Sequence, residues 1–249
     1  MKETAFWNNR VKKYGHTGWS DFATYYYDQN LRLNAINNLI RKYGINDTLA
    51  LDYGCGTGDF SKMMSQYFEN IIAVDISEEI INKAKLTNRN YKIKFKMIDK
   101  KIFTFKYNLI ICITVLQHIK NDDELNELIN NFNLSLNGNG IVIILESFSK
   151  EVDENNYTKL RNADFIKNMF SKCGFKLINF YNFYHPLYHP THLFKNYRKS
   201  FFVIILNMLC SYKFPFSKLL LYKIAKVISD KDNGIVETES ITKILLFKK

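Results

Sequence analysis

The sequence has little glycine, proline or cysteine. Ten glycines and three prolines in 249 residues leave little room for long flexible linkers. The cysteines are scattered and lack the C-x-x-C spacing of zinc sites and redox motifs: Cys55, Cys112, Cys173 and Cys210. This pattern indicates a protein of the reducing cytoplasm, with no disulfide framework and no structural zinc.

Long apolar runs are also missing. The longest, Phe201–Cys210, is interrupted by Asn207 and is too short to cross a bilayer as a helix. No apolar run follows Met1–Thr4, so we expect no signal peptide. Hydrophobic residues make up 47% and charged residues 24% of the chain. This is the balance of a globular protein, and the length suits a single domain over residues 1–249.

The formal net charge is +11, from 35 basic and 24 acidic side chains. Such a surplus can attract nucleic acid, an anionic membrane or phosphorylated metabolites. However, the lysines are dispersed, and the chain has neither an arginine-rich tract nor an RNA-binding signature. General compositional bias is the simpler interpretation. We therefore expect no stable nucleic-acid partner, while a small anionic substrate stays open.

Apolar strands alternate with amphipathic helices along most of the chain. The pattern predicts strands at residues 48–53, 70–74, 92–98, 108–113, 141–145, 175–183 and 240–247. It predicts helices at residues 31–43, 60–68, 122–136 and 162–172, with a further helix capped by Ser77 and a turn at Asn137–Gly140. Alternation of this kind predicts an α/β fold with a doubly wound, mostly parallel sheet of seven strands. A helical lid is expected at about residues 1–30, and a cap insertion before the last strand at about residues 186–236.

A glycine-rich loop lies where the first strand runs into a helix, within Leu49–Phe60. Residues without a Cβ let the backbone approach a ligand closely, and a helix N-terminus offers free N–H groups. The nicotinamide-binding pattern needs glycines at its first, third and sixth positions. Here the third glycine is at the fifth position, and Asp59 occupies the sixth. The loop therefore departs from the dinucleotide pattern.

Acidic residues stand at the ends of the first three strands. Asp52 precedes the glycines by two residues, Asp75 closes the second strand, and Asp99 follows the third. A carboxylate at the end of the second strand can accept hydrogen bonds from both hydroxyls of a ribose. The strand and loop Tyr107–Ile119 and the helix Phe165–Phe175 follow in order.

Together these segments resemble the class I methyltransferases that depend on S-adenosylmethionine (SAM), over about residues 45–183 and the last strand. The resemblance implies a Rossmann-like fold, SAM as cofactor and S-adenosylhomocysteine as product. It implies that Asp52 holds the methionine amino group and that Asp75 holds the ribose. The other cofactor residues that it implies, including one from the lid, are Gly54, Cys55, Gly56, Gly58, Ile76, Ile98, Asp99, Lys100, Ile113, Gln117 and Tyr14.

The chemistry depends on the acceptor atom. A neutral hydroxyl needs a general base, whereas an anionic oxygen does not. His118 is the first candidate for that base and His16 the second, and a structural role for His118 stays open. His185, His189 and His192 have a spacing that could hold a metal, but no carboxylate or thiol joins them nearby. Substrate contacts or loop positions are favoured for them, and we expect no metal.

The N-terminal segment Phe6–Arg32 resembles the lid of small bacterial methyltransferases from surface-polysaccharide clusters, including those that make the O-methyl phosphoramidate of capsules. The resemblance implies a small phosphate- or phosphoramidate-bearing acceptor, methylated on oxygen in capsule biosynthesis. Its candidate contacts are Arg10, Trp19, Tyr26, His185, His189, Arg198 and Lys199, with His16 beside them. A base-catalysed sugar O-methyltransferase, an RNA or protein methyltransferase and a SAM-binding protein without catalysis stay open. The oligomeric state is not predicted.

Overall fold

The computed structural model of the protein describes residues 2–20, 22–184 and 234–249. Contacts between residues divide the chain into two compact units. The first comprises residues 1–17, 43–181 and 241–249, and the second comprises residues 18–42 and 182–240. Most of the predicted cap insertion lies outside the described residues.

The first unit holds most of the central sheet and the helices that flank it. In chain order its helices are α1 (Lys2–Tyr14), α3 (Asp59–Met64), α4 (Glu78–Thr87), α5 (Asp122–Ser135) and α6 (Ala163–Lys172), with short 3-10 helices η1 (Lys100–Thr104) and η2 (Leu116–His118). Its strands are β1 (Asp47–Tyr53), β2 (Phe68–Asp75), β3 (Ile93–Met97), β4 (Tyr107–Ile113), β5 (Leu136–Ser147), β6 (Asp153–Glu154), β7 (Lys159–Leu160), β10 (Thr242–Lys248) and most of β8 (Lys176–Phe183).

The central sheet has the strand order β3-β2-β1-β4-β5-β10-β8-β9. The pairs among β1 to β5 are parallel, whereas β10 runs antiparallel to β5. The α/β fold with a mostly parallel sheet is therefore confirmed. The count of seven strands is wrong, because β9 (Ile235–Val236) adds an eighth that pairs antiparallel with the end of β8. Two residues are too few to leave an alternation that could be recognised in the sequence.

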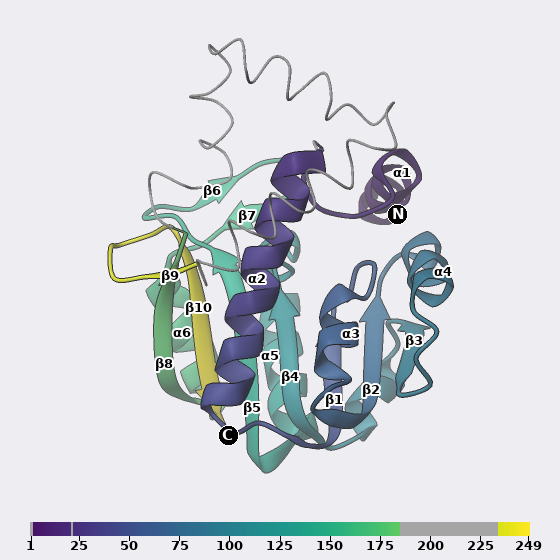
Figure 1. Ribbon diagram of the computed structural model, residues 1–249. Coiled ribbons are helices and arrows are strands. Elements are labelled where there is room, and N and C mark those ends of the chain that lie inside the picture. The colour runs from purple at the N-terminus through teal and green to yellow at the C-terminus, as the bar shows by residue number, and fades with distance from the viewer. Residues whose placement is uncertain (1, 21, 185–233) are drawn as a thin grey trace. The chain divides into compact units, whose positions relative to one another are not determined.

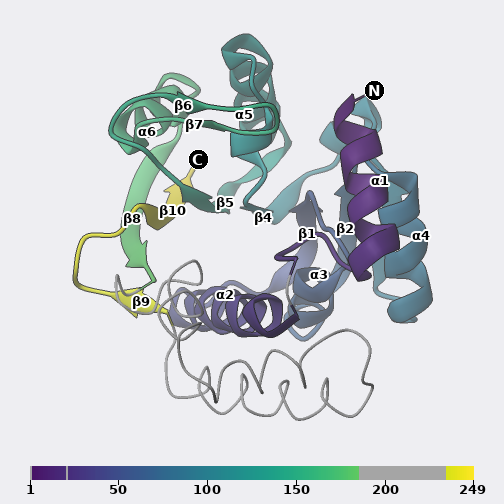
Figure 2. The ribbon, with the colours of Figure 1, turned by 90° about the horizontal axis from the view of Figure 1, so that it is seen from above.

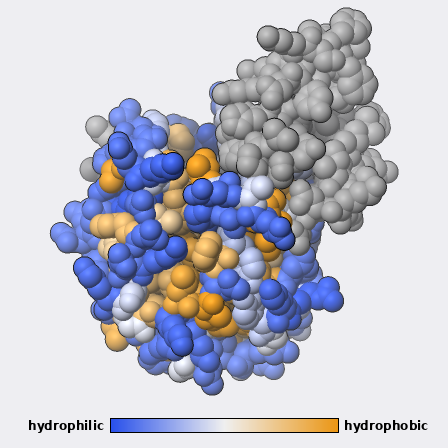
Figure 3. Space-filling model, turned by 90° about the vertical axis from the view of Figure 1, so that its left-hand side faces the viewer, coloured by the Kyte–Doolittle hydropathy of each residue, from blue (hydrophilic) through white to orange (hydrophobic). Residues whose placement is uncertain are grey.

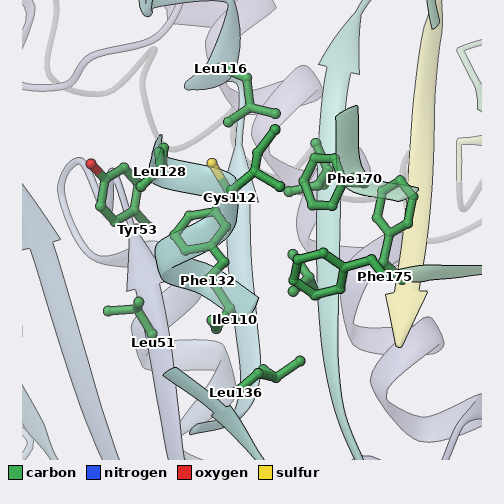
Figure 4. Close-up of a cluster of buried hydrophobic side chains, with 14 of the residues drawn as sticks. Leu51, Tyr53, Ile110, Cys112, Leu116, Leu128, Phe132, Leu136, Phe170 and Phe175 are labelled. Carbon is green, nitrogen blue, oxygen red and sulfur yellow. The ribbon is translucent and has the colours of Figure 1, made fainter. Parts of the chain in front are cut away.

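Helices cover both faces of this sheet. Helices α5 and α6 lie on one face and α3 on the other (Figures 1 and 2). The core under α5 and α6 is strongly aromatic, and Figure 4 shows Phe132, Phe170 and Phe175 converging on β4 and β5. The Phe170 ring stacks on Phe247 of β10, with centroids 4.1 Å apart. Burial of such apolar area is the main stabilising contribution to the fold.

Helix α5 illustrates how the local sequence specifies an element. The side chain of Asn121 accepts hydrogen bonds from the backbone N–H groups of Asp123 at 2.7 Å and Glu124 at 3.2 Å, which caps the first turn. Acidic residues follow in that turn, where they favour the positive end of the helix dipole. The buried face then repeats at helical spacing: Leu125, Leu128, Ile129 and Phe132.

Some expected boundaries differ from the observed ones. Asn137–Gly140 lies within β5 instead of forming a turn, and the pairing of β4 with β5 shifts register beside it. Helix α3 ends at Met64, because Phe68 already begins β2 and is buried there. The β6–β7 hairpin is not predicted, since each strand has only two residues.

The second unit contains α2 (Phe22–Lys42), β9 and the last two residues of β8. Helix α2 begins nine residues before the predicted start at Leu31, because its first turns are aromatic and lack a clean apolar period. Its buried Asp28 accepts hydrogen bonds from Trp19 Nε1 at 2.7 Å and from the Tyr184 hydroxyl. Arg32 completes an ion pair with Asp28 at 2.8 Å. This network packs the start of α2 against the end of β8 within the unit.

One side of the molecule presents apolar residues among polar ones (Figure 3). The exposed apolar side chains of β8 include Ile178 and Phe180, and Lys167 Nζ lies 4.8 Å from the centre of the Phe180 ring. Within the described residues, no helix combines the length and apolar character needed to cross a membrane.

Candidate active site

The glycine loop follows β1 in a conformation that favours glycine. Gly54, Gly56 and Gly58 have φ values of 77°, 52° and 85°, in the left-handed region. Two of them are also enclosed by side chains: a Cβ on Gly54 would lie 2.3 Å from Val115, and one on Gly58 would lie 2.7 Å from the ring of Phe95. These glycines therefore permit the left-handed turn of the loop and also let its backbone pack closely against Val115 and Phe95.

The carboxylate of Asp75 fastens this loop to the end of β2. Its Oδ2 accepts a hydrogen bond from Gly56 N and its Oδ1 accepts one from Ser77 N, both at 3.1 Å. The carbonyl of Val74 accepts two more from the loop, from Gly54 N at 2.8 Å and Cys55 N at 2.9 Å. Burial raises the pKa of Asp75. Each carboxylate oxygen has a second lone pair, so these bonds leave acceptor capacity for a ligand hydroxyl.

Asp52 lies at the end of β1 and is only 2% exposed. Its Oδ2 accepts a hydrogen bond from Ser61 Oγ of α3 at 2.5 Å. Burial raises the pKa of Asp52 to about 7, because a buried carboxylate loses its hydration. A cation bound beside it would lower this pKa again, which suits the methionine ammonium that the resemblance places here.

The residues expected beside adenine lie where β2 and β3 end. Ile98 N donates a hydrogen bond to Asp75 O at 3.1 Å. Ile76 is 41% exposed, whereas the last five residues of β2 before it are buried. Asp99 caps η1 by accepting from Lys101 N at 2.9 Å. Lys100 Nζ is 3.7 Å from Glu127 of α5. Roles for Asp99 and Lys100 at adenine stay predictions.

Helix α1 packs beside α4 in the first unit (Figure 2). Ser77 Oγ, the cap of α4, donates to the side-chain oxygen of Asn8 at 2.5 Å. Arg10 Nε donates to the carbonyl of Thr17 at 3.2 Å. The hydroxyl of Thr17 would lie 3.0 Å from a Cβ on Gly56, so the chain that follows α1 reaches the glycine loop.

His16 belongs to this same segment and is only 5% exposed. Burial, with a contribution from the nearby charge of Arg10, lowers the pKa of His16 to about 4. The ring is therefore neutral at neutral pH. Proton abstraction is most efficient when the pKa of the base lies near the working pH, so a value near 4 disfavours His16 as a base.

The loop after β4 is held by a buried carboxylate that the sequence analysis did not single out. Thr114 has a φ of 55°, which turns the chain sharply away from the strand. Glu146 Oε1 on β5 then accepts hydrogen bonds from Val115 N at 2.6 Å and Leu116 N at 2.7 Å. Glu146 therefore holds the first turn of η2 at the end of β4.

Arg161, at the end of the β6–β7 hairpin, holds the other end of that loop. It is 3% exposed, and its Nη2 donates to the carbonyls of Ile119 at 2.8 Å and Lys120 at 3.1 Å. Its Nη2 also lies 2.6 Å from Asp122 at the start of α5. No motif marked this residue in the sequence, because its partners are mostly backbone carbonyls.

His118 ends η2 between these two supports. Its Nδ1 donates a hydrogen bond to the carbonyl of Tyr157 at 2.9 Å, since a carbonyl can only accept. The proton is therefore on Nδ1, and Nε2 is the acceptor atom, to which Gln117 Nε2 donates at 3.4 Å. The ring of Trp7 meets that of His118 edge-on, with centroids 4.9 Å apart. Helix α1 thus contacts the loop after β4.

A groove of about 740 Å³ runs along α1. One wall comes from α1, and the other from Lys120 before α5 and from the turn of the β6–β7 hairpin. The lining residues are Ala5, Phe6, Asn9, Arg10, Lys13, Tyr14, Lys120, Asn156 and Tyr157. Two residues assigned from the sequence, Arg10 and Tyr14, therefore share one groove, and Tyr157 connects it to His118.

The other candidates fall in the second unit or outside the described residues. Trp19 and Tyr26 belong to the second unit, while His185, His189 and Arg198 fall outside the described residues. In the part of the chain that the structure describes, no cluster of three His, Cys, Asp or Glu side chains could hold a metal. Cys55 is buried, and burial raises its pKa well above its usual value, so the thiol is inert.

Residues 5–186 match the family described as DREV methyltransferase. The chain belongs to this family. It is an enzyme whose cofactor is SAM and whose product is S-adenosylhomocysteine. The turn of the glycine loop, Asp75 at the end of β2 and the buried Asp52 fit this cofactor.

Relatives of this methyltransferase differ in how much they share with it. An uncharacterized protein of Methanocaldococcus jannaschii is 28% identical over 81% of this chain and 82% of its own. A ubiquinone biosynthesis O-methyltransferase of Rickettsia bellii is 27% identical over 46% of this chain and about half, 52%, of its own. The solved structure of phosphoethanolamine N-methyltransferase 2 from Haemonchus contortus, in complex with SAM, has a TM-score of 0.60 at 15% identity. It covers 98% of this chain and 60% of its own, and at this identity it shows the fold alone.

Proposed function

We propose that this methyltransferase transfers a methyl group to an oxygen of a small anionic metabolite that bears a phosphate or phosphoramidate group. The observation that carries this proposal is the groove beside His118, which is lined by three basic side chains. The resemblance of Phe6–Arg32 to lids from surface-polysaccharide clusters supports a place in capsule biosynthesis.

The protein contributes binding and alignment. Bound SAM supplies an electrophilic methyl group on a sulfonium, so the acceptor needs mainly a nucleophilic oxygen in line with it. Asp52, the glycine loop and Asp75 would hold the cofactor. An anionic oxygen is already nucleophilic, so His118 would orient the acceptor and would not need to remove a proton.

The geometry of His118 favours a second candidate, base-catalysed methylation of a neutral sugar hydroxyl. The Nδ1–H is fixed by the carbonyl of Tyr157 at 2.9 Å, so Nε2 carries the lone pair that a general base requires. The same arrangement serves orientation in the first candidate. The acceptor that is methylated and the size of the effect of His118→Ala distinguish the two.

The test compares acceptors and a variant. The enzyme is incubated with SAM and, separately, with phosphoramidates, phosphate monoesters, amines such as phosphoethanolamine, and neutral sugars, and methyl transfer is followed by mass spectrometry. We expect transfer to oxygen of the anionic compounds, with turnover in His118→Ala reduced less than about 10-fold. Loss of a general base typically costs about 10²- to 10⁴-fold.

Two outcomes would contradict the proposal. Methylation of neutral sugars alone, with a steep fall in His118→Ala, would establish the base-catalysed reaction. Methylation of the amine alone would establish N-methylation, the reaction in the name of the Haemonchus enzyme. The variant Tyr91→Ala is the control, since it truncates an 88% exposed aromatic side chain that does not line the groove, and its turnover with either acceptor should stay within about threefold.

A further inference from the structure

We propose that the groove along α1 is the subsite for the anionic group of the acceptor, and that Lys13 and Lys120 bind this group together with Arg10. The inference rests on the proposed function and adds to it a place and a set of residues. The ligand class is a phosphate monoester carried on a small organic skeleton.

The charge of the lining is the first argument. Of the nine residues that line the groove, three are basic and none is acidic. Clefts lined by one sign of charge focus the electrostatic field and concentrate ligands of the opposite sign. The chain as a whole has 24 acidic residues, so the absence of acidic side chains from the lining is a feature of this groove and does not follow from the composition alone.

The arrangement of Arg10 is the second argument. Its guanidinium carbon lies 5.7 Å from the centre of the Phe6 ring and 5.4 Å from that of Tyr14. Its Nε donates to Thr17 O. Rings and a carbonyl therefore hold the group in place before an anion arrives, which reduces the conformational entropy that binding must remove. The fork of a guanidinium suits the paired oxygens of a phosphate.

The two lysines face the groove from its two walls. Lys13 Nζ lies 5.1 Å from the centre of the Tyr14 ring on α1. Lys120 Nζ donates to Asn155 O at 3.0 Å and lies 2.7 Å from Glu154. Glu154 offsets part of the charge of Lys120, so we expect Lys13 to contribute more to anion binding.

Each wall of the groove has a hydrogen bond to a segment of the proposed site. Arg10 holds Thr17 O, and Thr17 approaches Gly56 of the glycine loop. Across the groove, Tyr157 O fixes His118. Two lining residues therefore connect the groove to the two parts of the proposed site: Arg10 through Thr17 to the glycine loop, and Tyr157 to His118.

The size and the rings define the ligand further. A volume of about 740 Å³ is within the range of pockets for drug-sized ligands, roughly 300–1,000 Å³, and exceeds what a bare inorganic anion needs. Phe6 and Tyr157 stack on each other at 4.2 Å and form an apolar part of the lining. A phosphate monoester with an apolar or flat skeleton matches both features.

The experiment measures binding without methyl transfer. Phenyl phosphate is the probe and phenol its uncharged counterpart, each titrated by calorimetry into the protein saturated with S-adenosylhomocysteine. We expect binding of phenyl phosphate that weakens with salt, and no binding of phenol in the same concentration range. Lys13→Gln should weaken phenyl phosphate about 3- to 10-fold and Arg10→Gln more, as expected for charge-assisted contacts at a partly exposed site.

Lys12→Gln is the matched control. It removes the same charge from the neighbouring position of α1, but Lys12 pairs with Glu79 of α4 at 3.0 Å and does not line the groove. Its affinity for phenyl phosphate should equal that of the wild type. An equal loss in both lysine variants, or no binding of phenyl phosphate to the wild type, would overturn the inference. If the groove fails this test but small anionic acceptors are still methylated, the proposed function stands and only the inference about the groove is wrong. If phenyl phosphate binds in the groove but no anionic acceptor is methylated, only the proposed function is wrong.

Discussion

Asp52 couples the cofactor site to pH. Burial raises its pKa to about 7, so in the cofactor-free protein the carboxyl is largely protonated at pH 6. A bound ammonium favours the ionised form and lowers the pKa. We expect the affinity for SAM to rise between pH 6 and 7, and binding at pH 6 to release close to one proton. Calorimetry in two buffers of different ionisation enthalpy measures this number.

The raised pKa of Asp52 also makes the folding stability of the cofactor-free protein depend on pH, and this stability falls as the pH rises. Because the pKa is raised on folding, the folded state binds the proton more tightly than the unfolded chain does. Ionisation of Asp52 therefore lowers the stability of the cofactor-free protein as the pH rises from about 4 to about 7. In Asp52→Asn both this loss and the proton release should disappear. Proton release that persists in Asp52→Asn would assign the titration to another group.

Single residues of the site differ in how well the sequence indicates them. Asp75 follows from its place at the end of a buried strand, and the structure puts it against the glycine loop. Glu146 and Arg161 could not be found this way, because they act on backbone N–H and carbonyl groups from other strands. Such partners leave no pattern in the sequence until the register of the sheet is known.

The loop after β4 is the element on which alignment of the acceptor depends. Glu146 fixes its first N–H groups and Arg161 its last carbonyls, with His118 between them. Arg161→Met leaves the partly buried carbonyls of Ile119 and Lys120 without this donor and frees the end of the loop. We expect kcat to fall by about 10- to 100-fold, since displacement of a reacting group by 1 Å can cost about 10². The KM for SAM should rise by a smaller factor than kcat falls, because Asp52 and Asp75 stay in place on β1 and β2 while Gln117 moves with the freed loop.

Lys159→Met separates positioning from loss of an ion pair. Lys159 pairs with the same Asp122 at 2.9 Å, whereas the carbonyls of Ile119 and Lys120 are held by Arg161. Its kcat should stay within about threefold of the wild type, because an ion pair at a partly exposed site contributes little. Equal losses of kcat in the two variants would show that Asp122, and not the loop, accounts for the effect. Thermal unfolding of both variants shows which of them remains folded.

Elements with a strong apolar period could be predicted, and the others could not. Strands β1, β2 and β4 are buried on both faces, and their apolar runs gave nearly the observed bounds. Helix α1 and the first turns of α2 are aromatic and polar, so no apolar period marked them, and the sequence predicted only a helical lid over about residues 1–30 without their bounds. The β6–β7 hairpin carries Tyr157 and Arg161 at or beside its strands, yet its residues are mostly exposed. The sequence therefore did not predict the groove, whose walls are formed mainly by α1 and this hairpin.

The charge of the whole molecule admits two interpretations that the groove helps to distinguish. A net charge of +11 attracts any polyanion at low salt, because counterions are released from the nucleic acid. A specific nucleic-acid site also needs a continuous basic surface with groups that read bases. The groove instead collects a few basic side chains around a volume suited to a small ligand.

We therefore expect weak, salt-sensitive binding of nucleic acid and no methylation of it. Binding to tRNA or duplex DNA that is measurable at about 50 mM salt should be lost by about 200 mM, because contacts to several phosphates cost about 10³- to 10⁵-fold over that range. Fluorescence anisotropy with labelled tRNA and labelled duplex measures this, and SAM with a labelled methyl group reports any transfer. The control is Lys13→Gln, which should lower the affinity for tRNA no more than Lys12→Gln does, since dispersed charges contribute alike. Tight binding of one RNA at physiological salt, with methyl transfer to it, would contradict the small-acceptor proposal and make this member of the family an RNA methyltransferase.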